Sequence, residues 1–275
     1  MSVMVVGDNI VDVFDESGVA SVGGNCLNVA VHLDRFGVPA RYIGSVGDDA
    51  LGTAVLSALE TAGFATDHIT RRRGVTGYAM IHHTDGERHF GDFDRGASVV
   101  HLGEREWEAL AGAELIHSSY SSVLEDHLPR LAAIAPISFD FDSHFDDDYL
   151  RTLAPFVAHG FFSAAERAVN EIATKAEELI ADGMRTVTMT RADRGALHFT
   201  SAGTWSVDAE DITAADTLGA GDAFIAGVVA GIVRGDPIPD MLQAATRRAG
   251  EVCTTIGSLG LYVDADLVQL TRAAR

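Results

Sequence analysis

The sequence predicts an α/β fold in which a mostly parallel central sheet is flanked by helices and carries a small β insertion. Short β-branched runs alternate with longer apolar-periodic segments along most of the 275 residues, which is typical of βαβ units. Residues 74–98 instead form two alternating runs around Asp85-Gly86, which is a hairpin signal. Since no repeat or Pro-rich linker interrupts the chain, we expect a single domain over residues 1–275.

The elements expected in the first half start with a buried strand at Val3–Val6. A Gly-Gly-Asn turn then leads into an apolar-periodic helix over residues 27–36, which stops at a Gly and a Pro. A second strand at residues 42–46 and a second helix at residues 50–62 follow. The order strand, helix, strand, helix predicts neighbouring parallel strands.

The second half continues the same rhythm, with long apolar helices at its end. We expect strands at residues 115–117, 137–141, 160–162 and 186–190. We expect helices at residues 165–181 and from Asp222 and Met241 onward. Residues 205–207 are expected to close a small antiparallel edge.

The composition limits the classes of partner. A hydrophobic fraction of 47% and a mean hydropathy of +0.13 are enough for a sizeable core. The formal charge of -20 and the pI of about 4.7 argue against nucleic acid and anionic membranes as partners. Lys175 is the sole lysine, so a Walker A phosphate site is excluded.

Cysteine usage and the N-terminus predict a cytoplasmic protein. Cys26 and Cys253 are expected to be reduced, packed thiols. Met1–Val6 leads into a strand and does not resemble an export signal. The longest apolar stretch, residues 223–233, is far shorter than the ~20 residues that cross a bilayer.

A glycine-rich segment before an apolar helix is the strongest chemical signal. Gly219, Ala220 and Gly221 allow backbone N–H groups to approach an anion at the positive end of the helix dipole. Asp222, in the first turn, could accept a proton from an attacking hydroxyl. The alternative is that Asp222 only decorates a helix start, where Asp is favoured anyway.

A second cluster of short polar residues and glycines lies near the N-terminus. Side chains of this kind supply the paired donors and acceptors that a polyhydroxy ligand needs. On its own, Gly-Gly-Asn is an ordinary turn. The candidate substrate-binding residues here are Asp8, Asp12, Gly23, Gly24, Asn25 and Asn28, with Asn9 beside them.

Together the two segments resemble the ribokinase-like, or PfkB, family of carbohydrate kinases. Residues 23–30 look like the family's N-terminal motif, and Asp216–Phe224 looks like its C-terminal motif. The resemblance implies a ribokinase-like fold, ATP and Mg²⁺ as cofactors, and Asp222 as the catalytic base. It also implies that Asp12, Gly23, Gly24 and Asn28 contact sugar hydroxyls, and that insertions at about 14–22 and 74–98 form a β-sheet lid.

The same resemblance assigns a nucleotide side. Thr190, Arg191 and Gly195 look like the family's turn after a strand, although Ala192 stands where a Gly is usual. These three residues are expected to bind ATP together with Gly219, Gly221 and Thr254. Glu166 would assist Mg²⁺ through water, although Ser163 replaces the common Asn. Asp216 is a candidate for a monovalent cation such as K⁺, as in some relatives.

Within the family, the segments around Asp8, Asp48 and Arg88–Asp92 are most similar to fructoselysine 6-kinase. The acceptor implied is the 6-hydroxyl of a fructosyl amino acid. The residues expected to bind the amino-acid half of that acceptor are Tyr78, Arg88 and Asp92. The small-molecule alternative is a kinase for a free ketose, pentose or nucleoside. The alternative of another class is a non-catalytic sugar-binding module.

Three further expectations concern the surface. Because an isolated hairpin is only marginally stable, the hairpin at residues 74–98 could pair with its copy in a homodimer. The acidic run Asp146–Asp148, with Asp140 and Asp142 nearby, is interpreted as a solvated loop. Arg71–Arg73 is interpreted as surface charge or as a rim for an acidic substrate.

Overall fold

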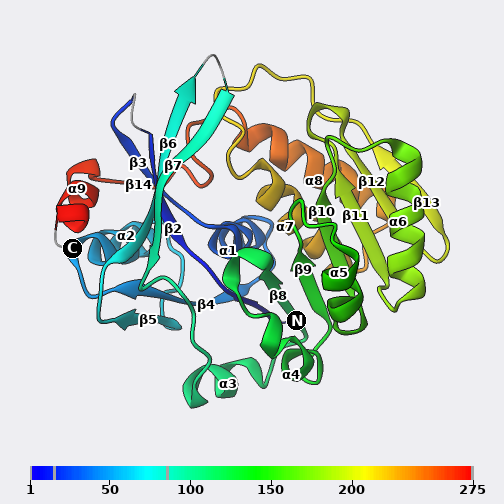
Figure 1. Ribbon diagram of the computed structural model, residues 1–275, viewed down its shortest axis with the longest axis horizontal. Coiled ribbons are helices and arrows are strands. Elements are labelled where there is room, and N and C mark those ends of the chain that lie inside the picture. Colours follow the sequence, from blue (N-terminus) through cyan, green and yellow to red (C-terminus); the bar gives the residue numbers. More distant parts are fainter. Residues whose placement is uncertain (1, 15–16, 85–86, 274–275) are drawn as a thin grey trace.

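The protein is built on two β-sheets, seen in the computed structural model of the chain (Figure 1). The structure describes residues 2–14, 17–84 and 87–273, with the side chains of all of these except residues 83, 84 and 87–90. A large sheet crosses the molecule, and a small sheet stands off it beside the C-terminal helix. This architecture confirms the predicted fold class.

The large sheet is parallel except at one edge. Its side chains alternate between two cores: Val3 and Val5 pack on one face, and Met4 and Val6 on the other. Strands β11, β12 and β13 pair antiparallel, and all other neighbours pair parallel. The strand order is β13 (Gly203–Val207), β12 (Ala196–Thr200), β11 (Thr186–Thr190), β10 (His159–Ser163), β9 (Ile137–Asp140), β8 (Leu115–Ser119), β1 (Val3–Val6), β4 (Ala40–Gly47) and β5 (Ile69–Arg72).

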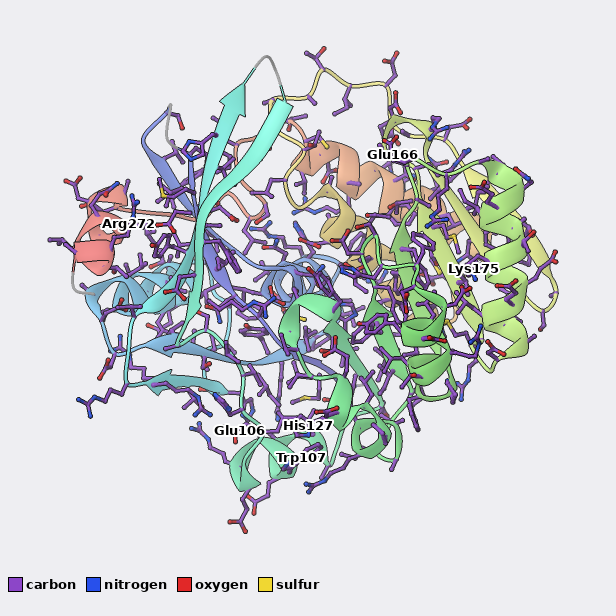
Figure 2. The ribbon with its side chains drawn as sticks, viewed as in Figure 1. Glu106, Trp107, His127, Glu166, Lys175 and Arg272 are labelled. Atoms are coloured by element: carbon purple, nitrogen blue, oxygen red, sulfur yellow. The ribbon has the colours of Figure 1, made fainter. Side chains whose placement is uncertain are left out.

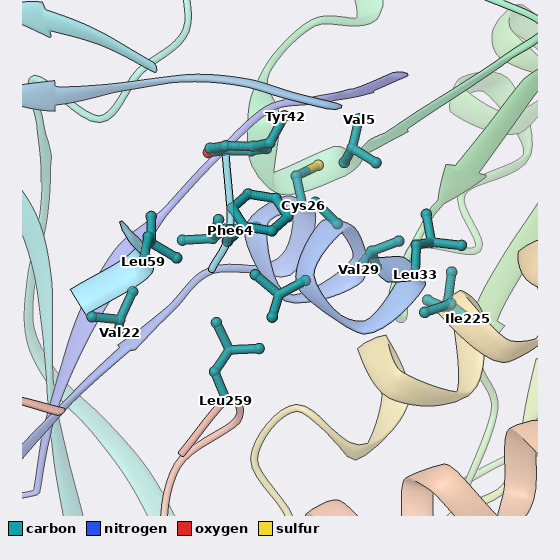
Figure 3. Close-up of a cluster of buried hydrophobic side chains, with 14 of the residues drawn as sticks. Val5, Val22, Cys26, Val29, Leu33, Tyr42, Leu59, Phe64, Ile225 and Leu259 are labelled. Carbon is teal, nitrogen blue, oxygen red and sulfur yellow. The ribbon is translucent and has the colours of Figure 1, made fainter. Parts of the chain in front are cut away.

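Helices cover both faces of this sheet, since both faces of a parallel sheet are apolar. One core contains side chains of α1 (Asn25–Arg35), α2 (Ala50–Thr61), α7 (Ala220–Arg234), α8 (Ile238–Val252) and α9 (Ala265–Ala273). The other contains side chains of α3 (Glu104–Leu110), α4 (Leu128–Ala132), α5 (Asp147–Leu153) and α6 (Val169–Ala181). Figure 3 shows α1 at the centre of the first core, with Val29 and Leu33 near Ile225 of α7.

The small sheet contains the predicted hairpin and three strands from elsewhere. Its order is β14 (Tyr262–Val263), β3 (Val19–Gly23), β2 (Ile10–Phe14), β6 (Thr76–Thr84) and β7 (Glu87–Gly96). β2 and β6 pair parallel, and the other neighbours pair antiparallel. The sheet thus joins chain segments that lie far apart in the sequence, including one near the C-terminus.

Two boundaries differ from the sequence prediction in ways that affect the site. Helix α6 starts at Val169 and not at residue 165, so Glu166 lies in the turn that precedes it. Helix α7 starts at Ala220, which places Asp222 inside its first turn. None of the helices within the described ranges is long and apolar enough to cross a membrane.

Candidate active site

Asp222 lies in the first turn of α7, behind a left-handed residue. Gly219 caps the helix with φ 79°, and a Cβ there would collide with the side chain of Ser258, so only glycine fits. Around Gly221 there is open space, with no atom near the position a Cβ would take. The start of α7 therefore presents backbone N–H groups next to room for an anion.

Two asparagines from the start of α1 hold the Asp222 carboxylate. Asn25 Nδ2 donates to Oδ1 at 3.0 Å, and Asn28 Nδ2 donates to Oδ2 at 2.7 Å. Asn25 Nδ2 also donates to Asp140 Oδ2 at 2.6 Å, so it bridges two carboxylates. Ser258 Oγ donates to Asn28 Oδ1 at 2.8 Å, which fixes the orientation of that amide. The carboxylate is thus oriented before any substrate binds.

The site concentrates negative charge. The pKa of Asp222 is raised from 3.8 to about 8, mainly by burial; the Asn28 hydrogen bond lowers it, and the charges of Asp140, Asp8 and Asp12 add to the rise. The side chain nevertheless keeps partial contact with solvent. Burial also raises the pKa of Asp140 to about 6. Desolvation and neighbouring carboxylates thus outweigh the helix dipole at Asp222, and a base with a pKa near 8 suits work near neutral pH.

A cavity of about 270 Å³ opens in front of Asp222 at the carboxyl ends of the central strands, where ligands bind in open α/β sheets. It has an anion-binding end at α7 and an acidic wall at the end of β9. Its polar lining comes from Asn25, Ser119, Ser121, Asp140, Asp142, Ser163, Thr190, Gly219, Gly221 and Asp222.

The N-terminal cluster contributes Asn25 to the lining of this cavity and supports it from behind. Asp8 accepts hydrogen bonds from the hydroxyls of Ser121 at 2.9 Å and Ser122 at 3.0 Å, and from the Asn25 backbone at 2.9 Å. Its carboxylate therefore ties the loop after β8 to the start of α1. Asp12 is buried next to Gly23, where a Cβ would lie 2.6 Å from Asp12 Oδ2.

The structure does not bring Tyr78 or Asp92 to the cavity. Tyr78 is buried, and its hydroxyl donates to Asp92 at 2.9 Å. Asp92 also pairs with Arg272 of α9 at 3.3 Å, and Figure 2 shows Arg272 at the outer side of the small sheet. Both residues thus lie on the face that packs toward α9. Arg88 belongs to β7, but its side chain lies outside the described ones.

On the nucleotide side, Thr190 lines the cavity and the turn after it is held by its own bonds. Arg191 donates from its backbone to Gly195 at 2.7 Å and from its side chain to the carbonyl of Arg194 at 2.6 Å. A Cβ on Gly195 would collide with Val207, so this glycine is required by the packing of β13. Thr254 is exposed and bonds to the end of α8.

The two residues assigned to cations differ in setting. Glu166 is exposed in the turn after β10 (Figure 2). Asp216 is buried, and its oxygens accept from the backbone N–H of Leu218 at 3.0 Å and of Gly257 at 2.9 Å. Asp216 therefore ties the segment before α7 to the segment after α8. Among the described residues, no group of three or more His, Cys, Asp or Glu side chains could hold a metal.

Sequence reasoning missed several residues at the site. Asp140 is buried at the end of β9 and bonded to Asn25, so it belongs to the site and not to the neighbouring acidic run, whose residues 146–148 are exposed. Ser121 follows β8, and Phe93 and Arg95 lie in β7. Asp140 lies near the end of one predicted strand and Ser121 follows another, and the rule that ligands bind at the carboxyl ends of parallel strands would have found both.

An oriented carboxylate beside open helix N–H groups, in a cavity at the ends of parallel strands, defines a phosphotransferase that acts on a hydroxyl. The model of the pfkB family of carbohydrate kinases matches residues 11–262. The chain belongs to this family and is a sugar kinase.

Individual relatives support this assignment over most of the chain. A fructosamine kinase FrlD of Bacillus subtilis (strain 168) is 33% identical over 94% of this chain and 93% of the relative. A fructoselysine 6-kinase of Escherichia coli (strain K12) is 32% identical over 90% of this chain and 95% of the relative. Among solved structures, a fructokinase with bound ATP from Xylella fastidiosa shares the fold with a TM-score of 0.79 at 20% identity, covering 99% of this chain and 98% of that one.

Proposed function

We propose that this kinase transfers a phosphoryl group from ATP, with Mg²⁺, to the 6-hydroxyl of a fructosyl amino acid. The observation that carries the chemistry is the Asp222 carboxylate, oriented by Asn25 and Asn28 beside the open start of α7. The names of the two relatives at 33% and 32% identity support the acceptor.

Asp222 aligns the attacking hydroxyl and accepts its proton as the bond from that oxygen to phosphorus forms and the bond to the leaving phosphate oxygen breaks. The N–H groups of residues 219–221 bind the oxygens of the group in transfer. Phosphoryl transfer needs positioning and charge stabilisation more than a strong base. A base with a pKa near 8 is therefore sufficient.

The N-terminal cluster is proposed to bind the sugar. Asp12 is buried below Gly23 on the side of the small sheet that faces Asp222. Asn25 Oδ1 is buried and has no hydrogen-bond partner in the described part of the chain. A substrate hydroxyl that donates to it would remove the cost of that unpaired acceptor. The small sheet would act as a lid over the bound sugar, and pairing of its hairpin with a second copy remains a proposal.

The residues present fit a nucleotide and a cation. The space at Gly221 admits phosphate oxygens, and Asp140 adds a buried carboxylate at the end of β9. Mg²⁺ supplies charge neutralisation for the phosphates when bound. Glu166, exposed after β10, would hold water on that ion, and Thr190, Arg191, Gly195 and Thr254 are proposed for the nucleotide. A K⁺ ion at Asp216 stays a prediction.

The test is a phosphotransfer panel of fructoselysine, other fructosyl amino acids, fructose, ribose and adenosine. We expect the highest kcat/KM for a fructosyl amino acid. A preference of more than about tenfold for a free ketose, pentose or nucleoside would overturn the acceptor and leave the kinase assignment intact. Near-normal turnover by Asp222→Asn would exclude Asp222 from the mechanism, and no turnover of any sugar by the wild type would favour a non-catalytic sugar-binding module.

A further inference from the structure

The two faces of the small sheet have different tasks. Asp12 pairs with Ala79, and Ala79 pairs with Phe93, so these three side chains project from one face. Val11 pairs with Tyr78 on the other face, which packs toward α9. Because Asp12 is near Asp222, the face with Phe93 is the one turned to the active site.

A small cavity of about 90 Å³ lies under this face. Asp8, Asn9, Ile10, Phe93, Arg95 and Ser121 are among its lining residues. Ser121 also lines the larger cavity that contains Asp222. The two cavities therefore adjoin, and together they form a site with a phosphoryl end and a small-sheet end.

Arg95 is a half-buried cation with no anionic partner among the described residues. The guanidinium lies over the ring of Phe93, 5.9 Å from the ring centroid. In the described part of the chain, no acceptor lies within hydrogen-bond or ion-pair distance of the guanidinium. The chain has 40 Asp and Glu against 20 Lys and Arg, so an unpaired arginine is unexpected. The nearby Asp92 is on the opposite face and is held by Arg272.

An unpaired guanidinium in a cavity offers a planar fork of N–H donors that fits a carboxylate. The proposed acceptor carries such a carboxylate on its amino acid. Its amino acid is bonded through nitrogen to C1, at the opposite end of the sugar from the 6-hydroxyl. With the 6-hydroxyl at Asp222, the amino acid extends away from the phosphoryl end and toward the small-sheet end.

We propose that Arg95 binds the carboxylate of the amino acid carried by the sugar, with Phe93 packed beside the linking atoms, and that this contact separates conjugated from free sugars. The inference rests on the proposed function and deepens it. Arg95 takes the role that was expected of Tyr78, Arg88 and Asp92; of these, Tyr78 and Asp92 lie on the other face. In this arrangement the uncharged sugar lies near Asp8, Asp12 and Asn25, and the carboxylate of the amino acid lies near the guanidinium of Arg95.

The test compares two acceptors that differ in the carboxylate alone: fructosylglycine and the matching fructosyl-methylamine. We expect the wild type to prefer fructosylglycine by about 10- to 100-fold in kcat/KM, as charge-assisted hydrogen bonds would give. Arg95→Gln should abolish that preference through KM, and should change kcat/KM for fructosyl-methylamine by less than about twofold. Arg95→Lys should recover part of the preference, because it restores the charge without the fork.

Arg272→Gln is the matched control, since it removes an arginine from the opposite face of the same sheet, and it should retain the wild-type preference. If Arg95→Gln keeps the preference, or lowers kcat/KM for both acceptors equally, the role of Arg95 is overturned while the proposed function stands. If the wild type phosphorylates neither conjugate but does phosphorylate a free sugar, the proposed function is overturned, and the role of Arg95 with it.

Discussion

The substitution Asp222→Asn should stabilise the protein while it abolishes catalysis. The pKa of Asp222 is raised from 3.8 to about 8 in the folded chain, so the folded state favours the protonated form more strongly than the unfolded state does. Ionised Asp222 therefore lowers the free energy of unfolding. The cost is absent well below pH 4, grows as the pH rises from about 4 to 8, and is constant above 8.

The magnitude follows from the size of the shift. One pKa unit corresponds to about 1.4 kcal/mol, so a shift of about 4 units sets a ceiling of roughly 6 kcal/mol. Solvent at the half-buried side chain reduces this ceiling. The asparagine also has one oxygen for two donor amides, which costs about 1 kcal/mol. We expect a net gain of about 1–3 kcal/mol at pH 8.5, or roughly 2–6 °C in Tm.

The assay is thermal or urea unfolding of wild type and Asp222→Asn across pH 5–9, together with turnover. The stability gap should widen with pH and level off above about 8, while kcat falls by several orders of magnitude. A variant that is less stable than wild type at pH 8.5 would refute the raised pKa of Asp222. A difference in stability that does not depend on pH would refute it as well.

Three further results are expected. At subsaturating ATP and sugar, kcat/KM should fall about tenfold per pH unit below pH 8, because protonated Asp222 cannot accept a proton. Asp140→Asn should move this acidic limb of the pH profile to lower pH. A limb that does not move would show that Asp140 does not raise the pKa of Asp222. Gly219→Ala should lower Tm, since the new Cβ collides with Ser258, whereas Gly221→Ala should keep Tm and weaken catalysis by crowding the anion site; equal effects on Tm would contradict the geometry. Asn28→Leu should reduce kcat by at least about tenfold, because Asp222 loses its 2.7 Å hydrogen bond; unchanged kcat would show that this bond does not orient the base.

Much of the site was predictable because local sequence encodes it. The glycines before Asp222 predict the start of α7, and alternating runs around Asp85-Gly86 predict the β6–β7 hairpin. Both signals involve residues close in the chain, so they need no knowledge of tertiary contacts.

The face of each hairpin residue was not predictable, because it depends on pairing. The pairing of Tyr78 with Val11, a residue distant in sequence, sends its side chain toward α9. A register shift between Ala79 and Ile81 also breaks the simple alternation along the hairpin. A one-residue change of register exchanges the faces, so local sequence does not show that Asp92 lies away from the site and Phe93 toward it.

Asp140 was missed for a different reason. It lies in a predicted strand, but it was considered with the nearby acidic run Asp146–Asp148, which is interpreted as a solvated loop. The strand β9 ends at Asp140, however, and buries it under Asn25. Position at the end of a parallel strand was a better guide than local composition.

The most direct measurement of the central claim is an NMR spectrum of the phosphorylated product made from ATP and a fructosyl amino acid labelled with ¹³C in the sugar. We expect phosphorus to couple to C6, and through one further bond to C5, of an intact conjugate. Coupling to C3 or C4 without coupling to C6, or a phosphorylated product from free sugars only, would contradict the central claim.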